Sequence, residues 1–316
     1  MTAASAPRPR IVSLLPSATE IVCALGLREN LVAVSHECDH PADVAGLPIV
    51  TRAKIDVKRT SREIDADIRA LLREGLGVYD IDTERLEQLA PELIVTQDQC
   101  DVCAVSYEDV LAAVRKLTGT SAEIVSLRPN RLADVWDDIR RVGAAAGVSQ
   151  RAHDLANDLG DRLVALGRRT RDLARVRIAC LEWLDPLMAA GNWIPELVEL
   201  TGGASDLATA GRHSPWLDFE KVAAFDPEVV CAMPCGFDLE RTERELAALL
   251  REPRWQELSA VRAGRCFAVD GNAYFNRPGP RLVESAEILA GLLHPHECSD
   301  LVPPRAAARV AASVAA

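Results

Sequence analysis

Short apolar runs alternate with amphipathic segments through the first third of the chain. The apolar runs have the length and composition of buried strands, and they cover residues 10–15, 31–34, 48–50, 93–95 and 124–125. The amphipathic segments have helical spacing and cover residues 17–26, 61–74, 83–89 and 107–117. Strands and helices that alternate in this order predict parallel pairing with right-handed crossovers.

The ends of two predicted helices carry recognisable signals. Ser17 and Glu20 have the spacing of a capping box, which predicts that the first helix begins there and ends at Gly26. The helix over 107–117 is expected to begin after Ser106. Both helices directly follow a predicted strand, so their N-termini are expected at the end of a sheet.

The middle of the chain has a different pattern. From Leu132 to Leu173 the apolar residues keep a helical period without a strand, and Gly143 and Gly147 are the positions where it would break. The last third returns to alternation. Its predicted strands and helices cover residues 176–181, 195–201, 229–232, 242–250, 266–269 and 280–293.

These patterns predict an α/β protein of two lobes, each with a parallel sheet flanked by helices, joined by a long helical connector. The N-terminal lobe is expected over residues 8–128, the connector over 129–173 and the C-terminal lobe over 174–298. Residues 299–316 are rich in Ala and Pro and are expected to form a flexible tail.

Composition narrows the possible partners. The chain has 316 residues, of which 48% are hydrophobic, and 36 Lys and Arg face 47 Asp and Glu, for a net charge of −11. That balance argues against a nucleic-acid backbone or an anionic membrane surface as partner. The first apolar stretch stops at Pro16, too short for a secretion signal, and no run could span a bilayer. The nine cysteines, an odd number, fit a reducing compartment, so we expect a cytoplasmic protein.

Four of the cysteines follow predicted strands and lie among polar and turn residues: Cys38, Cys100, Cys103 and Cys235. In a parallel sheet, the loops at the carboxyl ends of the strands face the ligand. These loops therefore predict a cleft that holds a soft metal or a metal-bearing ligand, or that uses a thiolate. Packing of small side chains in tight loops is the alternative.

The Cys100-x-x-Cys103 pair has several interpretations. It fits a redox pair or half of a zinc site, and a tetrahedral zinc site needs further ligands. Cys38 and Cys235 would supply them, or His36 and His40 would. The remaining cysteines of the predicted helices and strands fall at apolar positions and are expected to pack in the core, namely Cys23, Cys180, Cys231 and Cys266.

Two tryptophans are candidates for the wall of a cleft. Trp183 and Trp193 lie in polar, Pro-containing segments, and a flat apolar ligand needs large rigid faces. Core filling is the alternative for both. Trp136 and Trp255 lie in helical settings and are expected to be structural, whereas Trp216 fits either role.

Polar candidates follow two predicted strands. Arg52 comes after the strand over 48–50 and could anchor an anionic group. Asn272, Tyr274 and Arg277 come after the last strand, and the planar fork of Arg277 suits a bidentate contact with a carboxylate or phosphate. A loop hydrogen bond or a solvated charge is the alternative for each of them.

Several segments together resemble a known family. Residues 10–27 and 31–41 resemble the opening of the vitamin B12 and iron-siderophore substrate-binding proteins of ABC transporters, and residues 86–95 resemble that family's step from helix to strand. Three further segments are similar to a branch of cobalamin-binding proteins without a secretion signal, namely 100–106, 235–237 and 271–279. The resemblance implies a periplasmic-binding-protein-like fold. It also implies an ABC permease as partner, although cysteines in the cleft loops depart from the exported members.

The sequence therefore predicts a binding protein, not an enzyme, that holds cobalamin, a related corrinoid or another metal chelate between two lobes. Trp183 and Trp193 would wall the ligand, and Arg277 and Asn272 would anchor its polar edges. The four loop cysteines would line the floor and be the metal ligands. The remaining expected ligand contacts are His36, Arg52, Phe237 and Tyr274. The alternative is a cytoplasmic zinc-binding or thiol-dependent enzyme that uses Cys100 or Cys103, and a third possibility is an interaction protein that has lost its ligand.

Overall fold

The computed structural model describes residues 8–74, 78–98 and 122–311. The chain divides into two compact units. Unit 1 comprises residues 1–129 and 133–158, and unit 2 comprises residues 130–132 and 159–316. The units exchange at residues 129/130, 132/133 and 158/159, and the last of these points lies inside a long helix. The predicted limits of the lobes and the connector stay a prediction.

A four-stranded parallel sheet is the centre of unit 1. Its order is β2-β1-β5-β6, with β1 at Ile11–Ser13, β2 at Leu31–Val34, β5 at Leu93–Gln97 and β6 at Glu123–Leu127. All residues of β1 and β5 are buried, as expected of continuous apolar runs in a sheet covered on both faces. The α/β class and the parallel pairing predicted for this part of the chain are confirmed.

A second, two-stranded sheet in unit 1 was not predicted. β3 (Thr51–Ala53) pairs antiparallel with β4 (Tyr79–Ile81). The strand predicted over 48–50 therefore begins later than expected, although Ile49 forms an isolated parallel bridge with Val34. Each of the two strands has three residues with mixed exposure, too short for a readable period.

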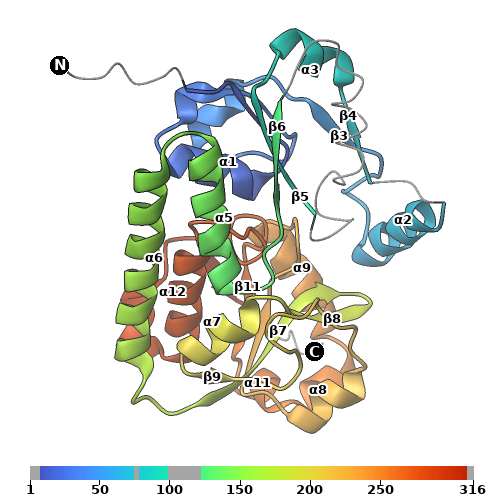
Figure 1. The fold of residues 1–316 in the computed structure, drawn as a ribbon. Coiled ribbons are helices and arrows are strands. Elements are labelled where there is room, and N and C mark those ends of the chain that lie inside the picture. Colours follow the sequence, from blue (N-terminus) through green and yellow to red (C-terminus); the bar gives the residue numbers. More distant parts are fainter. Residues whose placement is uncertain (1–7, 75–77, 99–121, 312–316) are drawn as a thin grey trace. The chain divides into compact units, whose positions relative to one another are not determined.

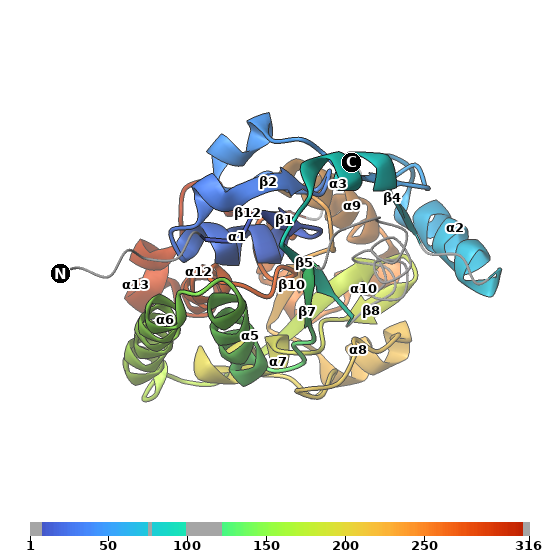
Figure 2. The ribbon, with the colours of Figure 1, turned by 45° about the horizontal axis from the view of Figure 1, so that its top comes forward.

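The helices of unit 1 largely follow the predicted ranges. They are α1 (Pro16–Ala24), α2 (Ser61–Arg73), α3 (Thr83–Leu89), α5 (Leu132–Ala145) and the first part of α6 (Ser149–Thr170), with 3-10 turns at Arg28–Asn30 and Ala42–Gly46. Figure 2 shows α1 beside β1 and β2. The helix predicted over 107–117 lies outside the described residues.

The predicted capping box at the start of α1 is wrong. The helix begins one residue earlier, at Pro16, and Leu15 is its N-cap with no side-chain hydrogen bond. Proline suits this position because its missing N–H would have no partner in the first turn. Ser17 Oγ is buried without a hydrogen-bond partner in the part of the chain that the structure describes.

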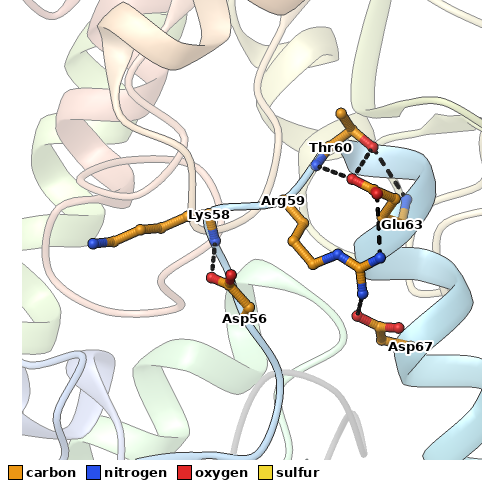
Figure 3. Close-up of polar contacts among 6 residues, drawn as sticks. All are labelled: Asp56, Lys58, Arg59, Thr60, Glu63 and Asp67. Carbon is orange, nitrogen blue, oxygen red and sulfur yellow. Dashed lines mark hydrogen bonds and ion pairs between the residues drawn. The ribbon is translucent and has the colours of Figure 1, made fainter.

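A capping box does form at α2 (Figure 3). The amide of Thr60 donates to Glu63 Oε2 at 3.0 Å, and the amide of Glu63 lies 3.4 Å from Thr60 Oγ1. Arg59 adds ion pairs to Glu63 at 3.2 Å and to Asp67 at 2.5 Å. The polar contacts thus fix the first two turns of a helix whose apolar Ile64 is buried.

The helical segment after residue 132 breaks at one of the two predicted glycines. Gly147 separates α5 from α6 and has a φ of 71°, which glycine adopts without steric cost. Gly143 instead lies inside α5, where an added Cβ would come within 2.2 Å of the Ala152 Cβ. The missing side chain therefore allows α5 and the start of α6 to pack closely.

Unit 2 contains a mixed sheet. Its order is β12-β11-β10-β7-β8, with β9 beside β7, and the central strands β11, β10 and β7 are parallel. The bounds are β7 (Val176–Leu184), β8 (Leu187–Ala189), β9 (Gly203–Ala204), β10 (Val229–Ala232), β11 (Cys266–Val269) and β12 (Ala307–Arg309). The edge strands β8 and β12 run antiparallel.

Residues 307–310, within the expected flexible tail, take part in the sheet of unit 2 and its core. β12 pairs with β11, and Val310 is buried in the same core cluster as Cys266. Alanine-rich sequence gave no strand signal here, because alanine is poor in strands and the pairing is set by tertiary contact.

Helices flank the sheet of unit 2. They are α7 (Ile194–Leu200), α8 (Phe219–Phe225), α9 (Leu239–Leu249), α10 (Pro253–Gln256), α11 (Ser259–Arg262), α12 (Leu282–Leu293) and α13 (Pro295–Cys298), followed by a 3-10 turn at Ser299–Leu301. Figure 1 shows α7 and α12 as neighbours.

Side chains expected in the core mostly lie there. Trp255 is fully buried, with its ring 5.2 Å from that of Phe219. Cys180, Cys231 and Cys266 are buried as predicted, whereas Cys23 is only partly buried. The predicted structural role of Trp255 and of the three strand cysteines is confirmed.

Candidate functional site

In unit 1, the loop after β2 places a histidine at the carboxyl edge of the sheet. The backbone N–H of His36 donates to Thr51 Oγ1 at 3.0 Å, and His36 Nδ1 lies 2.7 Å from the same oxygen. Thr51 Oγ1 donates in turn to Ser35 Oγ at 3.0 Å. Thr51 is the first residue of β3, so the short unpredicted ladder fixes the ring of a predicted site residue.

Tyr79, in β4, supports the same imidazole. Its ring centroid is 5.4 Å from that of His36, with the planes tilted by 52°, and its hydroxyl donates to Glu37 Oε1 at 3.0 Å. Burial lowers the pKa of His36, because a charged imidazolium would lose hydration there. At neutral pH the ring is therefore a neutral donor of electron pairs.

Cys38 lies in the same loop and is partly buried. Its Sγ is 3.0 Å from Thr19 Oγ1, which is also 2.8 Å from Ser13 Oγ. Thr19 belongs to α1 and Ser13 to β1, so the thiol contacts the junction between the first strand and the first helix. A hydroxyl near sulfur can stabilise a thiolate by hydrogen bonding.

Arg52 is oriented toward solvent. Its side chain is 81% exposed and pairs with Asp80, the residue opposite it on β4, at 3.0 Å. Burial alone would raise the pKa of Asp80, but hydrogen bonds from Arg52 and Lys54 outweigh it and hold that pKa below its usual range. Arg52 also lines a shallow depression of about 340 Å³ with residues of β3, β4 and the start of α3.

In unit 2, two aromatic residues meet at the carboxyl edge of the sheet. The ring centroids of Trp183 and Phe237 are 5.1 Å apart, tilted by 54°, and the Arg241 guanidinium lies 3.5 Å from the Phe237 centroid. Trp183 Nε1 donates to the carbonyl of Asp185 at 3.1 Å. Burial lowers the pKa of Arg241, and the stacked ring offers its face to the cation.

The loops after β10 and β11 are joined to each other. The amide of Asn272 donates to the carbonyl of Phe237 at 2.9 Å, and Asn276 Nδ2 donates to the carbonyl of Met233 at 2.8 Å. An added Cβ on Gly271 would stand 2.2 Å from the Pro234 carbonyl oxygen, so only glycine allows this approach. The two loops therefore form one continuous surface at the carboxyl ends of the parallel strands.

The polar residues predicted after the last strand do lie together. Arg277 is 6% exposed and its Nη2 donates to Asn272 Oδ1 at 2.9 Å. Burial raises the pKa of the neighbouring Asp270, whose Oδ1 accepts from the amide of Ala273 at 2.7 Å. Tyr274 is near this group, with the Arg281 guanidinium 5.4 Å from its ring centroid.

The tryptophans have different surroundings. Trp193 is 5% exposed and donates from Nε1 to the carbonyl of Phe275 at 2.8 Å, so it packs inside unit 2. Trp183 is 9% exposed, whereas Trp216 is 52% exposed. Ligand contact by Trp183 and Trp193 stays a prediction.

The predicted convergence of four cysteines also stays a prediction. Cys38 lies in unit 1 and Cys235 in unit 2, where it occupies the turn at Gly236 after β10. Cys100 and Cys103 lie outside the described residues. In residues 8–74, 78–98 and 122–311, no group of three or more His, Cys, Asp or Glu side chains could hold a metal ion.

Several residues of these clusters were not predicted, namely Thr51, Ser35, Glu37, Tyr79 and Arg241. Thr51 and Tyr79 gave no signal because the β3–β4 ladder was missed. Glu37 lies between the predicted site residues His36 and Cys38, and this position in the loop was the only sequence signal for it. Arg241 lies just before the helix predicted over 242–250, whereas α9 already begins at Leu239, after Asp238 accepts from the Arg241 amide at 2.8 Å.

The sequence of this chain matches a known protein family. The profile of the family described as periplasmic binding protein matches residues 11–273. The chain belongs to the periplasmic binding protein family. Members of this family are substrate-binding components of ABC transporters and not enzymes, so the predicted resemblance and the predicted class are both confirmed.

Individual proteins are similar to this chain over most of its length. The vitamin B12-binding protein of Vibrio cholerae is 27% identical over 284 residues, with 89% of this chain and 87% of that protein covered. The crystal structure of the periplasmic vitamin B12-binding protein of the same organism has a TM-score of 0.63 at 24% identity, covering 91% and 97% of the two chains. A periplasmic haem-binding protein of Pseudomonas aeruginosa has a TM-score of 0.67 at 21% identity, covering 92% and 94%.

A membrane span is absent from the part of the chain that the structure describes. None of its helices is long and apolar enough to cross a bilayer. The family assignment identifies this chain as a solute-binding protein.

Proposed function

We propose that this periplasmic binding protein family member binds cobalamin or a related corrinoid. The likeness to the vitamin B12-binding protein of Vibrio cholerae, which extends over 89% of the chain, carries the proposal. A corrinoid is a large, nearly flat ring with amide groups at its rim and a metal at its centre. Such a ligand needs apolar faces, a few polar anchors and, for an exchangeable metal position, one donor atom.

The carboxyl edge of each sheet, taken by itself, carries groups of some of these kinds. Phe237 and Trp183, 3% and 9% exposed, form an aromatic pair at the edge of the sheet of unit 2. Asn272 and Arg277 hold an amide and a guanidinium group in a fixed arrangement there. His36 supplies an imidazole. The loops that carry Phe237 and Asn272 are bonded to each other, so little ordering entropy would be lost when a ligand binds there.

Haem is the second candidate ligand. The structural likeness to the haem-binding protein of Pseudomonas aeruginosa favours it, and haem shares the flat macrocycle and the axial metal positions. The predicted use of zinc, the ABC permease as partner and the cytoplasmic location stay proposals. A pull-down with a corrinoid permease and fractionation of the native cell would address the last two.

Isothermal titration calorimetry with a panel of ligands tests the function. We expect saturable heat with hydroxocobalamin and cyanocobalamin at micromolar protein, weaker or no heat with haemin, and none with a ferric siderophore. An Asn272→Ala variant should bind both cobalamins more weakly, whereas Asn130→Ala, an exposed asparagine outside the β11 loop, should not. Heat with haemin alone would transfer the assignment to haem, and no heat with either cobalamin would reject the proposal.

A further inference from the structure

We propose that Nε2 of His36 binds the metal of the chelate as an axial ligand and replaces a water molecule there. The inference rests on the proposed function, because it requires a macrocycle that carries a metal. A metal already held by four ring nitrogens accepts only one or two further ligands. A single well-placed imidazole is therefore enough, and no cluster of protein donors is needed.

The hydrogen bonds of His36 accommodate a proton on Nδ1 and a free lone pair on Nε2. Thr51 Oγ1 has one hydrogen, which it donates to Ser35 Oγ at 3.0 Å. Its two lone pairs are left for the His36 backbone N–H at 3.0 Å and for His36 Nδ1 at 2.7 Å. In this hydrogen-bond arrangement Nδ1 carries the proton, and Nε2 keeps its lone pair. Metal-binding histidines in proteins are held in the same way, by a hydrogen bond at the other nitrogen.

Nε2 is also accessible. It has no polar partner among the residues that the structure describes, and it is not among the buried polar atoms that lack one, so solvent reaches it. The imidazole ring packs against Tyr79, with the two ring centroids 5.4 Å apart. The Tyr79 hydroxyl in turn donates a hydrogen bond to Glu37. The imidazole is therefore oriented before any ligand arrives.

The exchange balances without any redox step. The Co(III)–oxygen bond of aquacobalamin breaks and its water leaves, while the Nε2 lone pair forms the new Co(III)–nitrogen bond. No proton moves, because Nε2 is unprotonated beforehand. Cyanocobalamin keeps its cyanide, which imidazole does not displace, so it binds the same protein without the exchange.

Visible spectroscopy and calorimetry on the full chain distinguish axial coordination by His36 from corrinoid binding itself. Wild-type protein should shift the visible bands of aquacobalamin and leave those of cyanocobalamin unchanged. His36→Ala should lose the band shift and weaken aquacobalamin binding by ~10-fold or more, with cyanocobalamin binding nearly unaffected. The matched control is His153→Ala, which removes an exposed imidazole of α6 and should behave as wild type. Free imidazole should restore the band shift in His36→Ala.

Each other outcome is decisive. A band shift that persists in His36→Ala overturns the axial role of His36 and leaves the corrinoid function standing. A wild-type spectrum that does not change although calorimetry shows binding has the same consequence. Absence of heat with both cobalamins rejects the proposed function and the inference with it. If His36→Ala does not fold, Thr51→Val provides the test, because it removes the acceptor of Nδ1 and should reduce the band shift. A ferric haemin arm distinguishes iron from cobalt, since a nitrogen ligand at haem changes the Soret band.

Discussion

The indole Nε1–H of Trp193 donates a hydrogen bond to the carbonyl oxygen of Phe275, 2.8 Å away. Phe275 is fully buried with a φ of 62°, in the left-handed region that residues with a side chain rarely adopt. Its amide donates to Ser285 Oγ at 2.9 Å. Two hydrogen bonds thus hold a strained residue in the loop that also carries Asn272 and Arg277, and Trp193 has a clear role inside unit 2.

Replacing Trp193 by Phe should therefore destabilise the protein. The buried carbonyl of Phe275 would lose its donor, which is expected to lower the free energy of unfolding by about 1–3 kcal/mol. Urea denaturation followed by circular dichroism measures the change. Trp216→Phe is the matched control, because Trp216 is 52% exposed, and it should change stability little. Equal effects of the two substitutions would contradict this role for Trp193.

The capping box of α2 gives a second prediction. Thr60→Ala removes the hydroxyl that faces the Glu63 amide and should lower the free energy of unfolding by about 1 kcal/mol. Thr60→Ser keeps the hydroxyl and should stay close to wild type. Denaturation midpoints of the three proteins provide the comparison, and a stable Thr60→Ala protein would show that the ion pairs of Arg59 suffice.

Asp138 should make stability depend on pH. Burial raises its pKa from 3.8 to about 6, despite an ion pair with Arg141 at 2.7 Å. The folded protein holds this proton more tightly than the unfolded chain does. The stabilisation that protonated Asp138 gives the folded state is therefore complete below about pH 4 and is lost as the pH rises past about 6. At about 1.4 kcal/mol for each pKa unit, the loss amounts to up to about 3 kcal/mol.

Asp138→Asn should remove most of this dependence between pH 4 and pH 6. The neighbouring Asp137, whose side chain is 69% exposed, provides the control, since Asp137→Asn should keep the wild-type profile. Unfolding free energies measured across this pH range test the assignment. An Asp138→Asn profile parallel to that of the wild type would show that another group is responsible.

The cysteines should differ in reactivity. Burial raises the pKa of Cys180 to about 12, and its neighbour across the sheet, Cys231, is also buried with a raised pKa. Cys235 is only partly buried, in a loop. When the folded proteins are titrated with a thiol reagent, Cys235→Ser should therefore show one fast-reacting thiol fewer than the wild type. Cys180→Ser should show the same number as the wild type. Both cysteines should react in denaturant, and rapid modification of native Cys180 would contradict its burial.

Sequence patterns predicted the elements that are buried on both faces. β2, β10 and β11 occupy the predicted residues because each is an unbroken apolar run between turn residues. The strands β3, β4, β8 and β12 were missed because each has three residues, with partial exposure on at least one position. Their pairing is decided by tertiary contact, which leaves no period to read.

The sequence predicted which loop residues belong to the candidate site better than it predicted the contacts of those residues. Loops after strands are visible in sequence, and this was enough to select His36 and the group of Asn272 and Arg277. The partners of His36 were not visible. Thr51 is 15 residues away and is brought there by β3, and Tyr79 contacts Glu37 across 42 residues. Spacing along the chain contains no information on such pairs.

Corrinoid binding is the central claim, and calorimetric titration of the unmodified protein with cyanocobalamin tests it most directly. Cyanocobalamin excludes any contribution from exchange at the metal, so the heat reports binding of the macrocycle alone. We predict a saturable heat at micromolar protein that haemin does not suppress when added first. No heat with cyanocobalamin, or its abolition by prior addition of haemin, would contradict the account.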